Sequence, residues 1–553
     1  MRLKALSIAF CAASLLAADS RTAGTKPRDM CAPPPGGTAP SLPARLMTGQ
    51  GRIDFPITTS NPKAQEFFNQ GVAQMHSFWA VEAERSFLQA AALDPEAPMP
   101  HWGIAMVAAG DYRPHFQLVR DGVPANIKKT GTNVRTPEGG PGRAAAATKK
   151  ALELSAAPGK ATAVEKLYIA SIVARRNPDA ADPDQAYIDG LRAVVAAYPN
   201  EVEAQTYLAL HLMMGFTTPD KQPRPGSMEA AALLRDLMVK APDHMGVHHY
   251  VIHGFEGSTF AKDAWMSCRR YAELVTNIPH ALHMPGHIWA QTGKWDEAAH
   301  SFETAAENEL GYINADKLYT RGHHGHNVHF LISTYCHQGK YDEAIAAARG
   351  LLGFAENPRE AAAVDNFTTA YRQGWFGLMR TLVHFEKWDE ILDGKTLLVY
   401  DKPREQAWRH WAMGLAYAAK GNGRAAKREA KAMDASMKSL KEKTKELPKQ
   451  IEVGRQELDA QIALASKKID RSMKRMQAAS VAERALRYNE PPSYPRPVAE
   501  ALGRRALEQG KLAIAESAFR TALEQYPESG RAASGLAETL RREGKPIAAG
   551  AGQ

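Results

Sequence analysis

Hydrophobic and polar positions follow a helical period along most of the chain from residue 61 onward. Asn61-Pro62 has the features of a helix start, with Asn as the N-cap and Pro at the first helical position. Before this point, residues 24–60 are rich in Pro, Gly, Thr and Ser, which predicts a linker. We therefore expect an all-α protein whose helices begin near residue 61.

A tetratricopeptide (TPR) repeat organises this helical pattern. Gly71, Ala83, Phe87, Ala90 and Pro95 occupy positions 8, 20, 24, 27 and 32 of a 34-residue unit. Small residues at positions 8 and 20 let two antiparallel helices approach closely, and the Phe fills the space between hairpins. Two further units end at Pro199 and Pro242. Later units contain Gly286 with Phe302 and Gly339 with Ala344, and another runs from Gly503 to Pro527. The repeats predict a TPR-type α-solenoid, in which antiparallel helix hairpins form a right-handed superhelix.

Three changes of pattern set the expected domain organisation. Residues 110–142 and 217–227 are rich in Gly and Pro, and a long loop inside a compact array is often functional. The first of them could close one end of a groove. After residue 435 the pattern changes to charged helices with one apolar face. We expect a signal peptide at 1–23, a linker at 24–60, a TPR-like array at 61–435 with a histidine-rich segment at 244–337, a charged helical segment at 436–490, and a C-terminal TPR unit with a tail at 491–553.

The Lys-rich stretch from Lys438 to Lys474 contributes +4 to the net charge of +9. A solvated helix face explains this excess better than a nucleic-acid site, because no aromatic residues interleave the basic ones. We therefore expect no nucleic-acid partner.

The N-terminus resembles a secretory signal. Arg2 and Lys4 precede an apolar run from Ala5 to Ala18, which is too short to span a bilayer. No later segment is apolar enough to do so. A periplasmic or secreted location is expected, and the sequence does not decide whether Cys268 and Cys336 pair.

Histidines are concentrated in one part of the array: thirteen of the nineteen lie between His244 and His337. With Gly286 at position 8 of its unit, His280, His283 and His287 take positions 2, 5 and 9. Spacings of three and four residues place all three on one helical stripe. In TPR arrays these positions of the first helix face the concave groove, so the histidines are expected there.

The neighbouring units supply further histidines. His326 and His329 take positions 2 and 5 of the next unit. In the preceding unit, His244 and His248 share one stripe, whereas His249 and His253 share another. Gly246 could place the helix start later, which would leave His244 in the preceding turn and turn His249 and His253 inward. Glu256 would then lie close to the same stripe.

This pattern favours a metal site. Histidines four residues apart on a helix can clamp an ion, and imidazole suits zinc, copper, iron and nickel. Catalytic zinc sites commonly use three protein ligands and an open position, with a carboxylate nearby. Nitrogen-dominated ligation in an exported protein points to copper or zinc. Two alternatives remain: a hydrogen-bonded polar groove, and pH-dependent binding of a partner.

Several motifs resemble those of a largely uncharacterised family of exported bacterial TPR proteins. They include His249-Tyr250-Val251-Ile252-His253, Pro279-His280-Ala281-Leu282-His283-Met284-Pro285-Gly286-His287-Ile288, His326-Asn327-Val328-His329-Phe330-Leu331 and Tyr488-Asn489-Glu490-Pro491-Pro492. The resemblance implies a site built from His249, His253, His283, His287, His326 and His329. It adds Glu490 to the secondary candidates His244, His280 and Glu256. It implies no particular activity.

Three functions are compatible with the sequence. The first is an exported solenoid with a histidine-rich copper or zinc site, catalytic or not, which binds a small molecule or peptide in its groove. The second is a scaffold that binds a peptide or a partner protein in its groove, and the third is metal storage or delivery. No nucleophile, phosphate-binding loop or dinucleotide fingerprint stands out, so the catalytic residues, if any, are unassigned.

Overall fold

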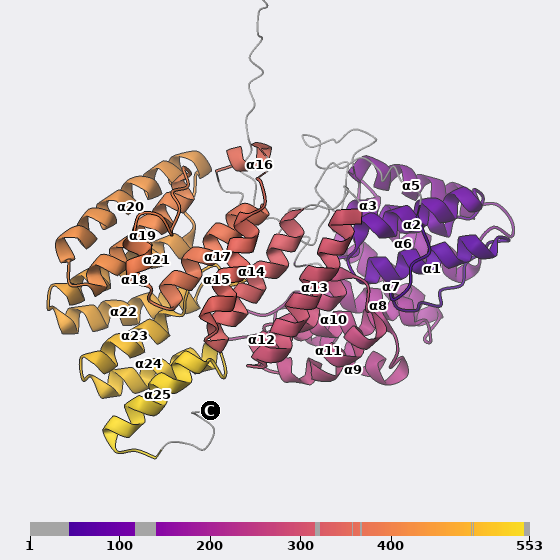
Figure 1. The fold of residues 1–553 in the computed structure, drawn as a ribbon. Coiled ribbons are helices and arrows are strands. Elements are labelled where there is room, and N and C mark those ends of the chain that lie inside the picture. The colour runs from indigo at the N-terminus through magenta and orange to yellow at the C-terminus, as the bar shows by residue number, and fades with distance from the viewer. Residues whose placement is uncertain are drawn as a thin grey trace, which may run out of the picture.

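Antiparallel helix hairpins stack side by side along nearly the whole chain (Figure 1). The computed structural model describes residues 44–114, 116, 140–315, 321–356, 358–364, 368–487, 489 and 491–546. Within these ranges, extended backbone pairs only at two isolated bridges, Gln50 with Val275 and Phe216 with Pro223. The predicted helix start is confirmed, since the Asn61 side chain caps the first helix and Pro62 opens it.

The helices fall into three consecutive groups. The first comprises α1 (Pro62–His76), α2 (Ala80–Leu93), α3 (Met99–Ala109), α5 (Gly140–Ser155), α6 (Ala163–Arg176), α7 (Pro183–Ala197), α8 (Val202–Leu212) and α9 (Ser227–Lys240). The second comprises α10 (Met245–Phe255), the 3₁₀ turn η2 (Ala261–Ala264), α11 (Trp265–Leu274), α12 (Pro279–Gln291), α13 (Trp295–Ala315), α14 (Arg321–Gln338), α15 (Tyr341–Leu352), α16 (Pro358–Ala362), α17 (Ala370–His384) and α18 (Trp388–Leu392). The third comprises α19 (Pro403–Ala419), α20 (Gly423–Thr444), α21 (Lys449–Ala465), α22 (Ile469–Arg484), α23 (Val498–Glu508), α24 (Leu512–Gln525) and α25 (Gly530–Glu543).

One contact between glycine and phenylalanine defines the repeat. The ring of Phe87 lies between Gly71 and Gly103, where a Cβ atom would stand 2.7 and 2.6 Å from the ring. The same contact recurs between Gly286 and Phe302 and between Gly503 and Phe519, at 2.5 and 2.8 Å. Only glycine lets the helices approach this closely around a phenyl ring. The all-α, TPR-type solenoid predicted from the repeat is confirmed.

The C-terminal unit returns to the middle of the array. The indole Nε1 of Trp295 donates a hydrogen bond to the Pro527 carbonyl at 2.9 Å. The ring of His337 stacks between those of Trp295 and Tyr526, with centroids 4.5 and 4.4 Å away. The yellow helices α24 and α25 therefore lie beside the second group, and α25 contacts α14 (Figure 1).

The predicted linker divides into two parts. Residues 24–43 and the predicted signal peptide at 1–23 lie outside the described residues. Residues 44–60 form no helix, but Phe55 is buried and its ring packs against those of Phe68, Trp102 and Tyr168 at centroid distances of 5.5, 6.0 and 5.2 Å. This part is therefore an arm fixed in the core of the first hairpins, because its aromatic side chain completes that core.

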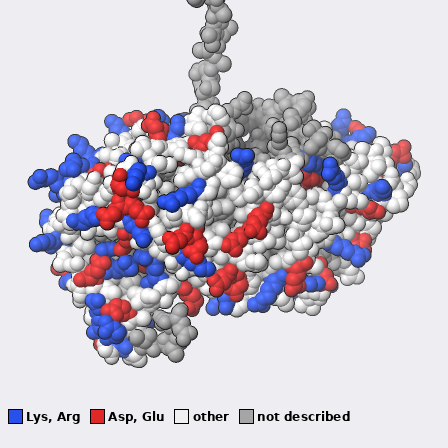
Figure 2. Space-filling view, viewed as in Figure 1, with Lys and Arg blue, Asp and Glu red and all other residues white. Residues whose placement is uncertain are grey.

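The expected boundary at residue 436 coincides with no break in the helices. It falls inside α20, whose buried residues Met433 and Leu440 continue one apolar face across it. Basic side chains are prominent at the end of the molecule formed by α20 to α22, and Lys438 and Lys474 are exposed (Figure 2).

Two further expectations concern cysteines and membranes. Cys268 and Cys336 are both free thiols in buried positions, so they do not pair. Among the helices that the structure describes, none combines the length and apolar composition needed to cross a bilayer.

Candidate metal centre

Helices α10, α12 and α14 place six histidines in one buried row, which we call the histidine seam. Its members are His249, His253, His280, His283, His287 and His326, and each is at most 8 % exposed. Centroids of successive rings are 4.7 to 6.3 Å apart, from His249 through His280 and His283 to His287. The histidines expected on the concave face are thus buried side chains. Neighbouring helices and aromatic rings cover these side chains, because the hairpins pack closely around them.

The start of α10 decides which of His244, His248, His249 and His253 turn inward. His244 is the N-cap, and its Nδ1 accepts a hydrogen bond from the Val247 amide at 3.2 Å. The helix begins at Met245, so His249 and His253 lie on the inner face, as the later helix start requires. A Cβ atom at Gly246 would stand 2.6 Å from the His76 ring, so this position needs glycine for the approach of α1.

Three seam histidines converge on one point. One nitrogen each from His249, His253 and His280 lies within 4.8 Å of the other two. The Nδ1 of His249 faces the main-chain carbonyl of His76, so it carries the proton and leaves a lone pair on Nε2. Within the described part of the chain, this Nε2 and both nitrogens of His253 are buried without a hydrogen-bond partner. Buried polar atoms normally have partners, so these atoms indicate a group that the protein alone does not supply.

The surroundings keep this trio dry. Burial, reinforced by His253, holds the pKa of His249 well below its ordinary value, so its ring is neutral and able to bind a metal. The ring of Phe78 covers the trio, with centroids 4.4 Å from His249, 5.1 Å from His253 and 5.3 Å from His280. Phe78 has a φ of +54°, an uncommon conformation for a bulky residue. Such backbone strain is often found at functional sites.

Glu256 orients the other half of the seam. Its Oε1 accepts a hydrogen bond from the Nδ1 of His287 at 2.6 Å, and its Oε2 lies 3.8 Å from the Nδ1 of His253. The Nε2 atoms of His287 and His283 are 2.7 Å apart. Burial holds the pKa of His283 well below its ordinary value. A carboxylate behind an imidazole fixes its tautomer and orientation, which is common around metal ligands.

A second cluster of possible ligands contains His76, Glu203 and His244. Glu203 accepts hydrogen bonds from the Nε2 of His76 at 2.6 Å and from the Nε2 of His244 at 2.9 Å. The Nδ1 of His76 is bonded to the Tyr250 hydroxyl at 2.9 Å. Burial alone would raise the pKa of Glu203, but the two histidines hold it well below its ordinary value. Every ring nitrogen of this cluster therefore has a protein partner.

Sequence reasoning missed two members of that second cluster. His76 is the last residue of α1 and Glu203 lies in the first turn of α8. Neither has a position in the repeat that marks it, and only the packing of α1, α8 and α10 brings them together. Spacing therefore gave no signal for either residue.

The remaining candidate residues lie outside the trio of His249, His253 and His280. The His326 ring is 5.0 Å from that of His283, whereas His329 packs against Phe376 of α17 at 5.6 Å and lies outside the trio. Three other histidines have partners of their own. His248 is hydrogen-bonded to Pro242 and Ser267, His323 to Glu309, and His324 to Ala306. Glu490 lies outside the residues that the structure describes.

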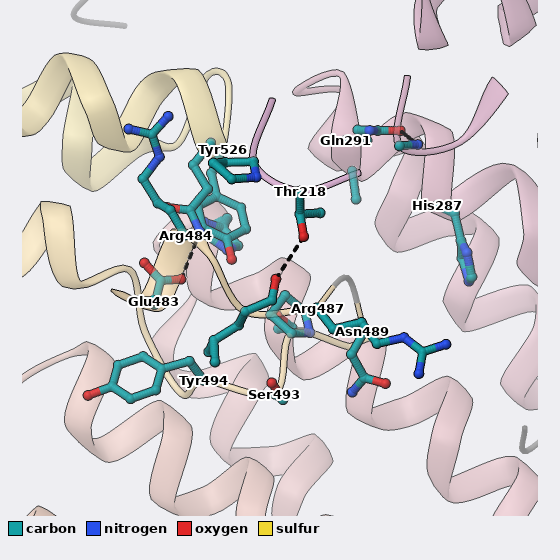
Figure 3. A pocket seen from close by; sticks show the side chains of 18 of the residues that line it. Thr218, His287, Gln291, Glu483, Arg484, Arg487, Asn489, Ser493, Tyr494 and Tyr526 are labelled. Carbon is teal, nitrogen blue, oxygen red and sulfur yellow. Dashed lines mark hydrogen bonds between the residues drawn. The ribbon is translucent and has the colours of Figure 1, made fainter. Parts of the chain in front are cut away.

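A pocket of about 410 Å³ adjoins the seam at His287 (Figure 3). Its walls come from α12 and α14 on one side and from α22 and α24 on the other. The second Gly/Pro-rich interruption forms part of the wall, and the Thr218 hydroxyl donates a hydrogen bond to the Leu486 carbonyl at 3.2 Å. The first interruption, which was expected to close a groove, lies largely outside the described residues.

Comparison with known proteins shows similarity to helical repeat structures. No protein-family model matches the chain, and no curated protein matches it. Human IFIT1 bound to m7Gppp-AAAA is 11 % identical, with 88 % of this chain and 91 % of that chain covered and a TM-score of 0.30. Cut9 in the APC/C hetero-tetramer Cut9-Hcn1 is 10 % identical, with 86 % and 76 % covered and a TM-score of 0.29. Yeast Tom70 is 9 % identical, with 87 % and 90 % covered and a TM-score of 0.24. Likenesses at this level carry no argument about function.

Proposed function

We propose that this chain binds one transition-metal ion, copper or zinc, through His249, His253 and His280. The observation that carries the proposal is the set of buried imidazole nitrogens without hydrogen-bond partners, the Nε2 of His249 and both nitrogens of His253. An ion at the point where the three rings converge would satisfy the Nε2 of His249 and one nitrogen of His253. The donor set fits, because neutral imidazole is a good ligand for both metals.

The geometry also supports a role for the rest of the seam. The main-chain carbonyl of His76 fixes the tautomer of His249, and Glu256 fixes that of His287. The three imidazoles would hold the ion, which would supply Lewis-acid or redox chemistry at this point. His283 and His287 extend from the trio to the pocket wall. This connection favours a site that serves a small ligand over storage or delivery alone.

A scaffold function remains the second candidate. TPR-like arrays are suited to binding partner proteins, because they present extended concave surfaces. Here the C-terminal unit packs back onto the array through Trp295 and His337, so the histidine seam adjoins a pocket of small-molecule size. This packing favours the metal site.

Elemental analysis of protein purified without a histidine tag tests the metal proposal. We expect about one copper or zinc ion per chain after reconstitution, and loss of that ion in His253→Ala and in the double variant His249→Ala/His280→Ala. His300→Ala is the matched control, because this residue is an exposed histidine of α13 and should keep the full metal content. A reconstituted wild-type protein without stoichiometric metal would exclude the proposal.

Export is proposed on the pattern of residues 1–23 alone. Cell fractionation with an antibody against the chain tests it directly. We expect a mature protein in the periplasm or medium that is shorter at its N-terminus, and recovery of the full-length chain in the cytoplasm would contradict this.

A further inference from the structure

The pocket beside the seam has an apolar body. Four aromatic side chains line it, Trp295, Phe330, Tyr494 and Tyr526. Its volume of about 410 Å³ lies in the range of pockets that enclose small organic ligands. The elements around it come from distant parts of the sequence, so the packing of the C-terminal unit against α12 to α14 creates it. Figure 3 shows Glu483, Arg484 and Tyr526 on one side of the pocket and His287 on the other.

The charged groups around this pocket favour an anion. Lys221, Arg484 and Arg487 are the cationic residues among the described lining, and Glu483 and Glu524 are the acidic ones. Figure 3 shows the Arg487 side chain extending from the segment after α22 toward the side of His287. Arg484 lies 3.7 Å from Glu524, so when Glu483 is neutral the cationic residues Lys221 and Arg487 are in excess. A cleft lined by an excess of one charge concentrates ligands of the opposite charge.

Glu483 controls this balance. It is 5 % exposed, and the amide Nε2 of Gln525 donates a hydrogen bond to its Oε1 at 2.7 Å. Burial raises the pKa of Glu483 to about 7. The other groups that influence this carboxyl are Arg484, Glu457, Tyr494 and Tyr526. Glu483 is therefore largely protonated below neutral pH, and its ionisation adds a negative charge to the pocket.

We propose that the pocket between α12, α14, α22 and α24 binds a small organic acid, a carboxylate with an aromatic or aliphatic body. The aromatic walls hold the body, and the basic groups Lys221 and Arg487 attract the carboxylate. This proposal goes beyond the metal site and does not require it. The lining includes none of His249, His253 and His280.

Calorimetric titration of the full chain at pH 6 tests the ligand class. The probes are 3-phenylpropionate, hexanoate and benzoate, with 3-phenylpropionamide as the neutral isostere of the first. We expect 3-phenylpropionate to bind at one site per chain, at least about tenfold more tightly than its amide. Equal affinity for the acid and its amide, or no binding of any of the three acids, would overturn the proposal.

Three variants locate the binding site. Arg487→Gln should weaken binding of 3-phenylpropionate about tenfold, whereas Arg475→Gln, on the far part of α22, should leave it unchanged. Between pH 6 and 8.5 the wild-type affinity should fall about three- to tenfold as Glu483 ionises. Glu483→Gln should abolish this pH dependence and keep the affinity measured at pH 6. An unchanged pH slope in Glu483→Gln, with the fold confirmed by circular dichroism, would contradict the assignment.

Titration of protein stripped of metal by a chelator distinguishes the two proposals. It should bind 3-phenylpropionate as the untreated protein does, because no pocket residue belongs to the trio. Loss of metal binding in the trio variants with retained probe binding would support both assignments. Probe binding that disappears in the trio variants would contradict the independence of the pocket.

Discussion

The Nδ1 of His249 donates a hydrogen bond to the main-chain carbonyl of His76, which lies 173 positions earlier in the chain. This contact ties the end of α1 to the inner face of α10. It also fixes the tautomer of His249, so the Nε2 lone pair points into the trio. A backbone carbonyl in this role is a common way to orient a metal-binding imidazole. The first hairpin of the array is therefore part of the candidate site.

Substitution of Glu203 should separate the two histidine clusters. Glu203→Gln replaces one carboxylate oxygen that accepts from His76 or His244 with an amide group that donates. We expect the free energy of unfolding to fall by about 1–3 kcal/mol, because a buried network loses an acceptor. Metal content should stay unchanged, since His76, Glu203 and His244 satisfy one another. Denaturant unfolding and elemental analysis of the same preparations measure both quantities. Retained stability with lost metal would move the metal site to this cluster.

Two glycines of one hairpin should respond in opposite directions to alanine. Gly286→Ala would place a Cβ atom 2.5 Å from the Phe302 ring, and we expect a loss of about 1–3 kcal/mol from overpacking. Gly311 lies in α13, and an added methyl group there would meet no atom within 4 Å, so Gly311→Ala should stabilise by about 0.5–1 kcal/mol. Melting temperatures of both variants test the prediction. A neutral Gly286→Ala would show that the hairpin can open without cost.

Acid should loosen the contact between α17 and the C-terminal unit. Arg504 and Arg505 donate to Glu386, the first of them at 3.0 Å. Burial alone would raise the pKa of Glu386, but Arg505, Arg496 and Arg504 lower it to about 2 from 4.5. Because the folded-state pKa is depressed, the stabilisation is complete above about pH 4.5 and is lost as the pH falls toward 2. It amounts to roughly 3 kcal/mol.

The variant Glu386→Gln should therefore lower the melting temperature at pH 7 and flatten its decline between pH 4.5 and 2. Glu508→Gln is the matched control, because Glu508 also pairs with Arg505, at 2.8 Å, but is largely exposed. Exposed ion pairs contribute about 0–1 kcal/mol, so its effect should be small. Equal effects of the two variants would contradict the buried role of Glu386.

Much of the fold could be read from local pattern. The spacing of Gly71 and Phe87, and of Gly503 and Phe519, identified hairpins because each repeat encodes its own helix pair and the contact between them. The same register placed His280, His283 and His287 on one stripe of α12. The domain boundary expected at residue 436 lies inside α20. The surface charge changes there, but the apolar face of the helix continues.

The sequence by itself determined the helix hairpins, the repeat and the histidine-bearing helices, since these depend on residues within one or two repeats of each other. The tertiary structure alone decided that His280 joins His249 and His253, that the main-chain carbonyl of His76 orients His249, and that His329 turns away. It also decided that Glu203 joins His76 and His244, and that the C-terminal unit closes a pocket against His287. The longest of these relationships join residues that lie about 170 to more than 230 positions apart in the chain. Their distance in space depends on the accumulated curvature of many stacked hairpins, which no local spacing encodes.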